Sequence, residues 1–375
     1  MITVQRLCRE CFLRIFRGKG DIRIVDPVEC NVCEGLSGEI EKFVDLIEEK
    51  LDGYEFDTFS IGTKIDADII EKEEKIRRSI SEDFRDIKTW LNRKIGKELE
   101  RRTGKKLVYS DYDINVIIDT RFDHVTLQVT PVYLYGRYLK LVRGIPQTKW
   151  PCRICRGIGC RKCNYTGKQY FESVEEIIAK KALEEFQGDD ESFHGCGRED
   201  IDARMLGNGR PFVLEIKNPK KRRANLKELE KKINEYASGK VKVVGLRYSD
   251  KNEIRRLKEE SFPKVYHAKI FADEEIQEKR LKEVLSSLEG KIIKQKTPLR
   301  VAHRRADKIR EKKIYGCKPI WVKGREALIE IKAESGTYIK ELVSGDEGRT
   351  RPSIAEMLGS RCEVKELDVV AVEGE

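Results

Sequence analysis

The chain has 375 residues, of which 39% are hydrophobic and 38% are charged. This length accommodates two or three globular domains with a sizeable core, and the composition argues against wholesale disorder. No apolar run approaches the roughly 18 residues that a membrane-spanning helix needs, and the N-terminus lacks the apolar core of a signal peptide. We therefore expect a soluble, cytoplasmic protein.

The charge balance suggests one kind of partner. The chain carries 76 Lys and Arg against 66 Asp and Glu, which gives a net charge of +10. A modest excess of positive charge among so many charged residues fits a partner whose charge is matched locally and not over the whole surface, such as a structured nucleic acid. A surface covered with ion pairs, as in heat-adapted proteins, would give the same composition. Both interpretations remain open.

The first part of the chain has a mixed α and β pattern. Ile40–Leu51 has helical periodicity, and residues 70–102 hold one or two long charged helices. Three β-rich runs follow, at Ile114–Asp119, His124–Val129 and Val132–Tyr138. Together with the segment Phe59–Ile65, these elements suggest a small α+β RNA-binding domain.

Beyond Gly167, strands and helices alternate, which predicts an α+β domain with a mixed, largely antiparallel sheet flanked by helices. The expected helices are Val174–Phe186, Leu226–Ala237, one near Ile254, Glu275–Leu288, one entered at Thr337, and Ser353–Leu358. The expected strands are Phe212–Lys217, Val241–Tyr248, Val265–Phe271, Ile292–Gln295, Ala327–Ala333 and Cys362–Val370. We place the domain boundary between residues 170 and 171.

Eight of the eleven cysteines form four Cys-x-x-Cys pairs: Cys8/Cys11, Cys30/Cys33, Cys152/Cys155 and Cys160/Cys163. Two residues between thiols let a tight turn present both sulfurs to one metal, and two pairs complete a tetrahedron. We therefore predict two structural zinc ions. An iron–sulfur cluster remains the alternative for the second quartet. The chain length and the missing export signal argue against a disulfide framework.

Two glycine-containing segments carry residues suited to chemistry. The first, residues 195–212, reads as a loop, and its Asp200 and Asp202 would share a face if that part were an extended strand. In the second, residues 333–349, a strand leads to a glycine turn, and Thr337 can cap the following helix. From the residues alone, a bracing Arg–Asp network and a packing tyrosine explain these clusters without any catalytic role.

Both segments resemble motifs of pseudouridine synthases. Gly197-Arg-Glu-Asp200 resembles their Gly/His-Arg-x-Asp loop, and Ser335-Gly-Thr-Tyr338-Ile-Lys340 resembles their Gly-Thr-Tyr-Ile-Arg motif, with lysine in the last place. The longer runs GREDIDARMLGNGRPFVLEI and TPLRVAHRRADKIR, with the cysteine pairs, resemble the tenth tRNA pseudouridine synthase family of archaea and eukaryotes. The resemblance covers essentially the whole chain.

The resemblance implies a two-domain tRNA-modifying isomerase. Residues 1–170 would form a zinc-bearing, THUMP-like accessory domain that binds tRNA, and residues 171–375 the pseudouridine synthase catalytic domain. The implied reaction converts uridine to pseudouridine at positions 54 and 55 of the tRNA T-loop. It needs no redox cofactor and no catalytic metal, and we expect neither a membrane nor a required protein partner.

The resemblance also implies residue roles. Asp200 is the implied catalytic aspartate; attack on the ribose, attack on the base and removal of a sugar proton all remain open for it. The implied substrate-binding residues are Tyr266, Tyr338, Ile339, Lys340 and Leu367. Tyr266 would stack on the base, and Lys340 would stand against the aspartate in place of arginine.

Basic segments are candidates for the RNA contact. We expect it in residues 297–310, at Arg300, His303, Arg304 and Arg305, while the run Lys217–Arg223 is a second candidate. A methyltransferase or thiolase would need a glycine-rich nucleotide loop that the sequence does not contain. A non-catalytic zinc-bearing adaptor, which would bind tRNA without isomerising a base, remains the alternative function.

Overall fold

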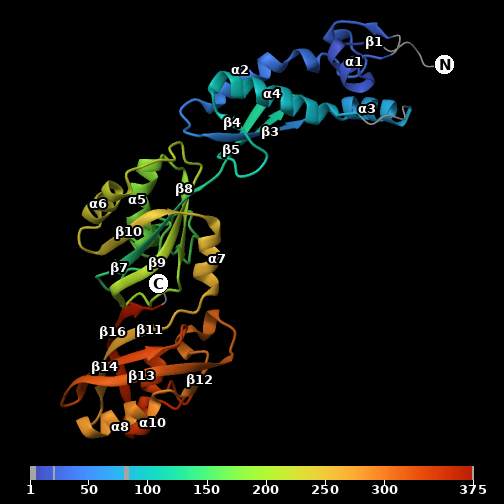
Figure 1. Cartoon of the computed structure of the whole chain (residues 1–375). Helices are drawn as coiled ribbons and strands as arrows, with labels where there is room; N and C mark the ends of the chain where they lie inside the picture. The colour runs from blue at the N-terminus through green and yellow to red at the C-terminus, as the bar shows by residue number, and fades with distance from the viewer. Residues whose placement is uncertain (1–5, 20–21, 80–83, 374–375) are drawn as a thin grey trace. The chain divides into compact units, whose positions relative to one another are not determined.

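The computed structural model describes residues 6–19, 22–79 and 84–373, and the chain forms two compact units (Figure 1). Unit 1 contains the chain up to Pro131 together with Phe186–Asp190 and Lys217–Arg223. Unit 2 contains the remainder: Val132–Glu185, Glu191–Ile216 and Ala224–Glu375. This division differs from the expected boundary at residue 170, because the second cysteine quartet and the strand before it belong to unit 2.

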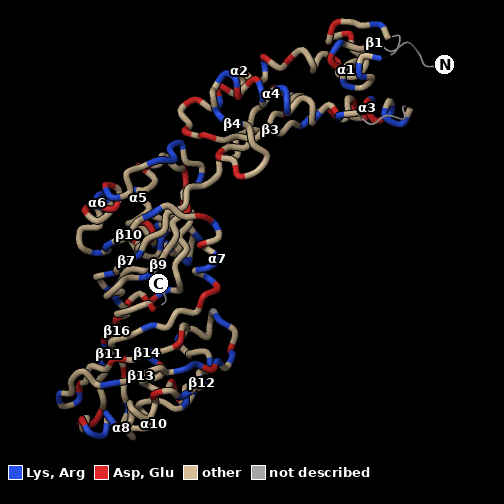
Figure 2. The backbone as a smooth tube through the Cα atoms, viewed as in Figure 1, with Lys and Arg blue, Asp and Glu red and all other residues tan. Residues whose placement is uncertain are grey.

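Lys and Arg alternate with Asp and Glu along both units (Figure 2), as the near-balanced composition predicts. Within the described residues, no helix is long and apolar enough to cross a membrane. The expectation that the N-terminus lacks a signal peptide depends partly on residues 1–5. These residues lie outside the described ranges, as do residues 80–83 of the expected helical region.

Unit 1 contains a four-stranded sheet in the order β4-β3-β5-β6, in which only the β5–β6 pair is antiparallel. Its strands are β3 (Thr58–Lys64), β4 (Lys106–Leu107), β5 (Ile114–Asp119) and β6 (His124–Val129). Its longer helices are α2 (Ile40–Leu51), α3 (Ala67–Ser79) and α4 (Ile87–Thr103). The expected helix at 40–51 and the strands at 114–119 and 124–129 are confirmed to the residue.

The first cysteine quartet belongs to the core of unit 1. It lies among α1 (Arg9–Phe16), the short strands β1 (Arg6–Leu7) and β2 (Arg23–Ile24), and the short helices η1 (Pro27–Glu29) and η2 (Leu36–Gly38). All four thiols are buried and join one apolar cluster with α2, α4 and the sheet. This region and the sheet therefore share a single core.

Unit 2 is built on a ten-stranded sheet in the order β10-β7-β9-β16-β11-β14-β13-β12-β15, with β8 paired to β9. Along this order, every strand pair is antiparallel except β16 with β9, which confirms the mixed, largely antiparallel sheet. The strands are β7 (Val132–Lys140), β8 (Asp190–Gly195), β9 (Arg204–Lys217), β10 (Val241–Ser249), β11 (Lys264–Ala272), β12 (Ile292–Lys296), β13 (Ile309–Lys323), β14 (Glu326–Ala333), β15 (Thr350–Arg351) and β16 (Cys362–Val372).

Helices flank this sheet, as expected. They are α5 (Val174–Phe186), α6 (Leu226–Tyr236), α7 (Lys251–Glu259), α8 (Glu278–Leu288), α9 (Ile339–Ser344) and α10 (Ile354–Leu358), with short helices η3 (Arg161–Cys163) and η4 (Leu299–Arg304). Strands such as β11 and β14 alternate buried and less buried residues, because successive side chains of a strand point to opposite faces of the sheet.

Several local expectations differ from the structure. The segment expected to be a loop through residue 212 becomes β9 from Arg204 onward, and β8 and β13 were not predicted. Asp200 and Asp202 lie in a turn rather than a strand. Thr337 does not cap α9, because the N-cap of this helix is Tyr338. The Thr337 hydroxyl instead donates to the Glu334 carbonyl at 2.7 Å.

The basic run Lys217–Arg223 is part of unit 1 and has protein partners there. The Arg222 guanidinium lies 3.0 Å from the Asp113 carboxylate and donates to the Thr130 carbonyl, and Arg223 pairs with Asp57. Lys220 lies over the ring of Tyr54. These contacts give the run a structural role within unit 1.

Candidate active site

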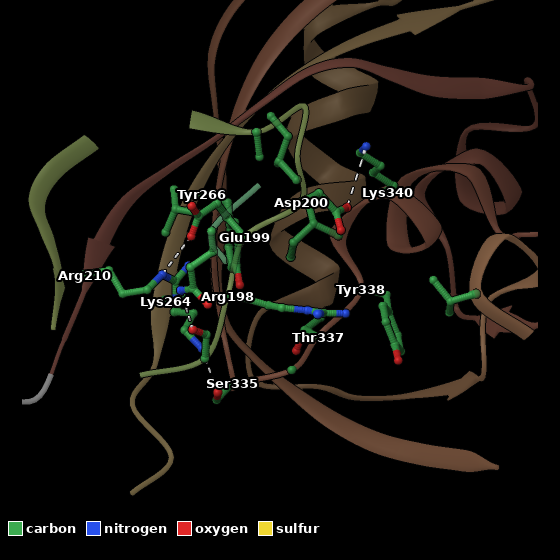
Figure 3. Close-up of a pocket in the computed structure, with 18 of the residues that line it drawn as sticks. Arg198, Glu199, Asp200, Arg210, Lys264, Tyr266, Ser335, Thr337, Tyr338 and Lys340 are labelled. Carbon is green, nitrogen blue, oxygen red and sulfur yellow. Dashed lines mark hydrogen bonds and ion pairs between the residues drawn. The ribbon is translucent and has the colours of Figure 1, made fainter. Parts of the chain in front are cut away.

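The turn between β8 and β9 presents Asp200 to a pocket of about 410 Å³ (Figure 3), within the size range of small-molecule sites. Gly197 shapes this turn, because its φ of +70° is a conformation that residues with a Cβ rarely adopt. A Cβ at this position would also come within 3.2 Å of the Lys264 Nζ. The Asp200 side chain is 34% exposed, so a substrate can reach it.

Two cations stand at the Asp200 carboxylate. The Arg300 guanidinium, from η4, lies 3.1 Å from it, and the Lys340 ammonium, from α9, lies 3.7 Å from it. Lys340 is closer to Asp202, at 2.6 Å. Although burial opposes a charge here, Lys340 lowers the pKa of Asp202 below its usual value. Asp200 therefore has cations from two different elements within 4 Å of its carboxylate.

Arg300 has a second carboxylate partner. Its Nε lies 2.6 Å from Glu341, which is almost fully buried at the start of α9. Burial disfavours the charge on Arg300, but Glu341 and Asp200 together raise its pKa above the usual value. A buried carboxylate thus holds the Arg300 guanidinium beside Asp200.

Aromatic and apolar side chains line the pocket. Tyr266 from β11 and Tyr338 from the start of α9 lie on either side of Asp200 in the view of Figure 3, and Ile339 and Leu367 complete the wall. Burial raises the pKa of Tyr266 to about 12, so its hydroxyl stays protonated at neutral pH. The structure thus brings all six predicted catalytic and substrate-binding residues to one pocket.

Tyr338 is held at its main chain and at its hydroxyl. The fully buried Gln295 accepts from the Tyr338 amide at 2.9 Å and donates to its carbonyl at 2.9 Å. Arg305 donates to the Tyr338 hydroxyl at 2.7 Å and lies above its ring. The ring is therefore fixed from both ends.

The predicted RNA-binding residues separate into two groups. Arg300 and Arg305 line the pocket and contact its side chains. His303 is exposed on η4, and the side chain of Arg304 lies outside the part of the chain that the structure describes. RNA binding by these residues stays a prediction.

Sequence reasoning gave no role to three buried charged residues beneath the turn: Lys140 on β7, Glu199 in the turn, and Arg210 on β9. It also missed Lys264 on β11, whose pKa falls to about 8, mainly because it is buried and also because Arg210 is near. The alternation of residues along the strands could have indicated their burial, because Lys140 and Lys264 fall on the buried face of β7 and β11.

Both cysteine quartets have the geometry of a four-thiolate metal site. Within each quartet the sulfurs lie within 4.8 Å of one another. The Cys8–Cys33 and Cys160–Cys163 Sγ atoms are 3.7 Å apart, and the Cys155–Cys163 Sγ atoms 3.8 Å. A zinc–sulfur bond of about 2.3 Å requires sulfurs about 3.8 Å apart in a tetrahedron. The donor sets therefore fit a metal ion of this kind.

Comparison with known proteins identifies the family. Residues 133–373 match the family described as Pus10, C-terminal, and residues 43–119 match the archaeal Pus10 THUMP domain. The chain belongs to the Pus10 family.

Its relatives include proteins named tRNA pseudouridine synthase Pus10. The one from Archaeoglobus fulgidus is 45% identical over 98% of this chain and 99% of its own length. The one from Methanocaldococcus jannaschii is 44% identical over 95% of this chain and 78% of its own length. Among solved structures, "Crystal Structure of a Cbf5-Nop10-Gar1 Complex" aligns with a TM-score of 0.35 and 16% identity, covering 63% of this chain and 48% of the other.

Proposed function

We propose that this protein, a member of the Pus10 family of tRNA pseudouridine synthases, isomerises uridines 54 and 55 of the tRNA T-loop with Asp200 as its catalytic carboxylate. The observation that carries the proposal is the Asp200 carboxylate, partly exposed in the pocket and flanked by Arg300 and Lys340. The archaeal relatives support the substrate class. The two T-loop positions rest on the motif resemblance.

The pocket residues fit the steps of this isomerisation. The target uridine leaves the loop's stack, at a cost of a few kcal/mol, and its base enters the pocket. Arg300 and Lys340 lie beside the Asp200 carboxylate, which acts as nucleophile or base while the bond between ribose and N1 breaks. Tyr266 stacks on the detached base as it turns to present C5. The ribose C1′ then bonds to C5, C5 loses its proton and N1 gains one, so that the product is an isomer of the substrate.

The loop of the second cysteine quartet, residues 151–171 (the knuckle loop), supports an accessory contact with tRNA. It contains five Lys and Arg and not one Asp or Glu. Ile158, Tyr165 and Phe171 are 92%, 76% and 85% exposed. A loop that carries both cations and exposed aromatic rings, here Tyr165 and Phe171, suits phosphates and unstacked bases. Arg156→Ala/Arg161→Ala should weaken tRNA binding and flatten its salt dependence by a little under one unit of slope per lost contact; an unchanged slope would argue against the contact.

Each quartet, we propose, holds one structural zinc ion. The sulfur spacing fits, and burial of the first quartet in the core of unit 1 makes its metal part of folding. Metal analysis of the purified chain should give two zinc ions. Cys30→Ser should lose one and destabilise unit 1, whereas Cys317→Ser, which alters a cysteine outside both quartets, should lose none. An iron–sulfur absorption band would contradict this proposal.

The function is tested by incubating the chain with an unmodified tRNA transcript and mapping pseudouridine at single-nucleotide resolution. Formation at positions 54 and 55 is expected, in keeping with an enzyme that acts on tRNA in the cytoplasm. Formation elsewhere would refute the T-loop assignment. Tight binding without any pseudouridine would instead favour the non-catalytic adaptor.

A further inference from the structure

The main chain of the Asp200 turn is held from below by Lys140, at the end of β7. The Lys140 side chain is fully buried, and its Nζ donates to the carbonyls of Ile145, Asp200 and Ile201 at 3.0, 3.1 and 3.2 Å. An ammonium group has three N–H donors. All three are therefore used on main-chain carbonyls, and one of these carbonyls belongs to Asp200 itself.

Other buried side chains bind the earlier part of the same turn. Arg210, 1% exposed, donates to the Cys196 carbonyl at 2.7 Å. Gln147 donates to the Gly197 carbonyl at 2.9 Å. Four main-chain carbonyls between residues 196 and 201 thus accept hydrogen bonds from buried side chains, which define the path of the turn.

Glu199 supplies the counter-charge. One of its carboxylate oxygens accepts from Arg210 Nε at 2.9 Å and from the Tyr138 hydroxyl at 2.8 Å. The other lies 3.6 Å from Lys140 Nζ, and within the described residues it has no hydrogen-bond partner. This second oxygen therefore interacts with the Lys140 ammonium, while the first oxygen binds Arg210.

This buried charge is a poor means of stabilising the fold. Replacing buried ionic groups by apolar ones of similar volume is often neutral or stabilising, and burial lowers the pKa of Lys140. The presence of Lys140 on the buried face of β7 is better explained by its hydrogen bonds to the turn carbonyls than by a contribution to stability. Misplacing a reacting group by about 1 Å can lower a rate on the order of a hundredfold.

We propose that Lys140 is a positioning residue for the reaction: by binding the carbonyls of Asp200 and Ile201, it fixes the Asp200 carboxylate relative to the bound uridine, with Glu199 as its counter-charge. The inference rests on the proposed catalytic role of Asp200. It assigns Lys140 no contact with substrate.

The test is a single-turnover measurement with enzyme in excess over unmodified tRNA transcript. Lys140→Met keeps the length of the side chain and removes its donors. We expect its rate constant to fall at least tenfold while the Kd for tRNA stays within about twofold of wild type. The matched control is Lys242→Met, on the neighbouring strand opposite Leu139, where the lysine is exposed; its rate should be unchanged.

Rate constant and amplitude distinguish positioning from a folding role. If Lys140 only supported the fold, Lys140→Met would lower the melting temperature and the fraction of active enzyme, but its folded molecules would react at the wild-type rate constant. That result would overturn the proposal.

A second variant decides the matter if Lys140→Met folds poorly. Lys140→Gln removes the charge but keeps N–H donors for the turn carbonyls, and it leaves Glu199 paired with Arg210 at 2.9 Å. We expect its rate constant per folded molecule to lie above that of Lys140→Met. A rate constant no higher than that of Lys140→Met would contradict positioning. The proposed function fails separately, if wild type forms no pseudouridine or if Asp200→Asn remains active.

Discussion

Charged groups meet the Asp200 turn on two sides, and the sides differ in exposure. Beneath the turn, the side chains of Lys140, Glu199 and Arg210 are at most 1% exposed and bind the main chain or each other. At the pocket, Arg300 and Lys340 are 36% and 24% exposed and approach the carboxylate itself. The buried side holds the backbone, while the exposed side can exchange its contacts when a nucleotide enters.

The largest effect should separate the two carboxylates of the turn. Asp200→Asn keeps the shape but leaves neither a nucleophile nor a base, so we expect the rate to fall by at least about a thousandfold. Asp202→Asn removes only the 2.6 Å partner of Lys340, and we expect a loss of about tenfold or less. Pseudouridine yield against time measures both variants. A nearly normal rate for Asp200→Asn with an inactive Asp202→Asn would exchange their roles.

The next effect compares the two exposed cations. Lys340→Ala and Arg300→Ala each remove one positive charge from Asp200, and each should lower the rate by about tenfold to a hundredfold. Only Arg300→Ala also leaves the buried Glu341 carboxylate without its cation, which should lower the free energy of unfolding by roughly 1–3 kcal/mol.

Thermal or denaturant unfolding of the two variants therefore provides the internal control for the cation comparison. Equal stability losses would show that Glu341 does not depend on Arg300. An unchanged rate in both variants would mean that neither cation acts on Asp200.

A smaller effect should follow from Tyr338→Phe. The change removes the 2.7 Å bond from Arg305 but keeps the ring, whose main chain is still held by Gln295. We expect a few-fold lower rate, whereas Tyr338→Ala, which removes the ring, should lose much more. Single-turnover rates compare the two. Equal losses would place the role of Tyr338 in its hydroxyl rather than in its ring.

Local periodicity was enough to predict many elements. Val174–Phe186 and Ile114–Asp119 have the predicted limits because their apolar residues repeat with the period of a helix and of a strand. The strand Ile309–Lys323 was missed, because its charged residues and proline weaken the pattern. It is a strand through its pairing with β12 and β14, which no local window contains.

The same limit applies to the site. Asp200, Tyr338 and Lys340 could be assigned to one active site from the sequence because each lies in a short motif that resembles a pseudouridine synthase motif. The partners that fix the turn are distant in the chain: Lys140 is 60 residues from Asp200, and Arg300 is 100 residues away. Sequence analysis assigned Arg300 to RNA, while the structure also places it at the carboxylate. Contacts of this kind depend on sheet order and not on any local pattern.

The last prediction concerns the stability of the fold and not turnover, and it involves Lys264, a buried cation that donates to Ser335 at 2.7 Å. Its pKa is lowered from 10.5 to about 8, mainly by burial. Between these two pH values the unfolded chain holds a proton at Lys264 that the folded chain has released, so raising the pH stabilises the fold. Wild type should therefore gain roughly 2 kcal/mol relative to Lys264→Met between pH 8 and pH 10. Denaturant unfolding at several pH values measures this difference, and the exposed Lys242→Met should show no such rise. A flat difference for Lys264→Met would mean that this lysine is as well solvated as a surface lysine, and that burial beneath the turn is confined to Lys140 and its partners.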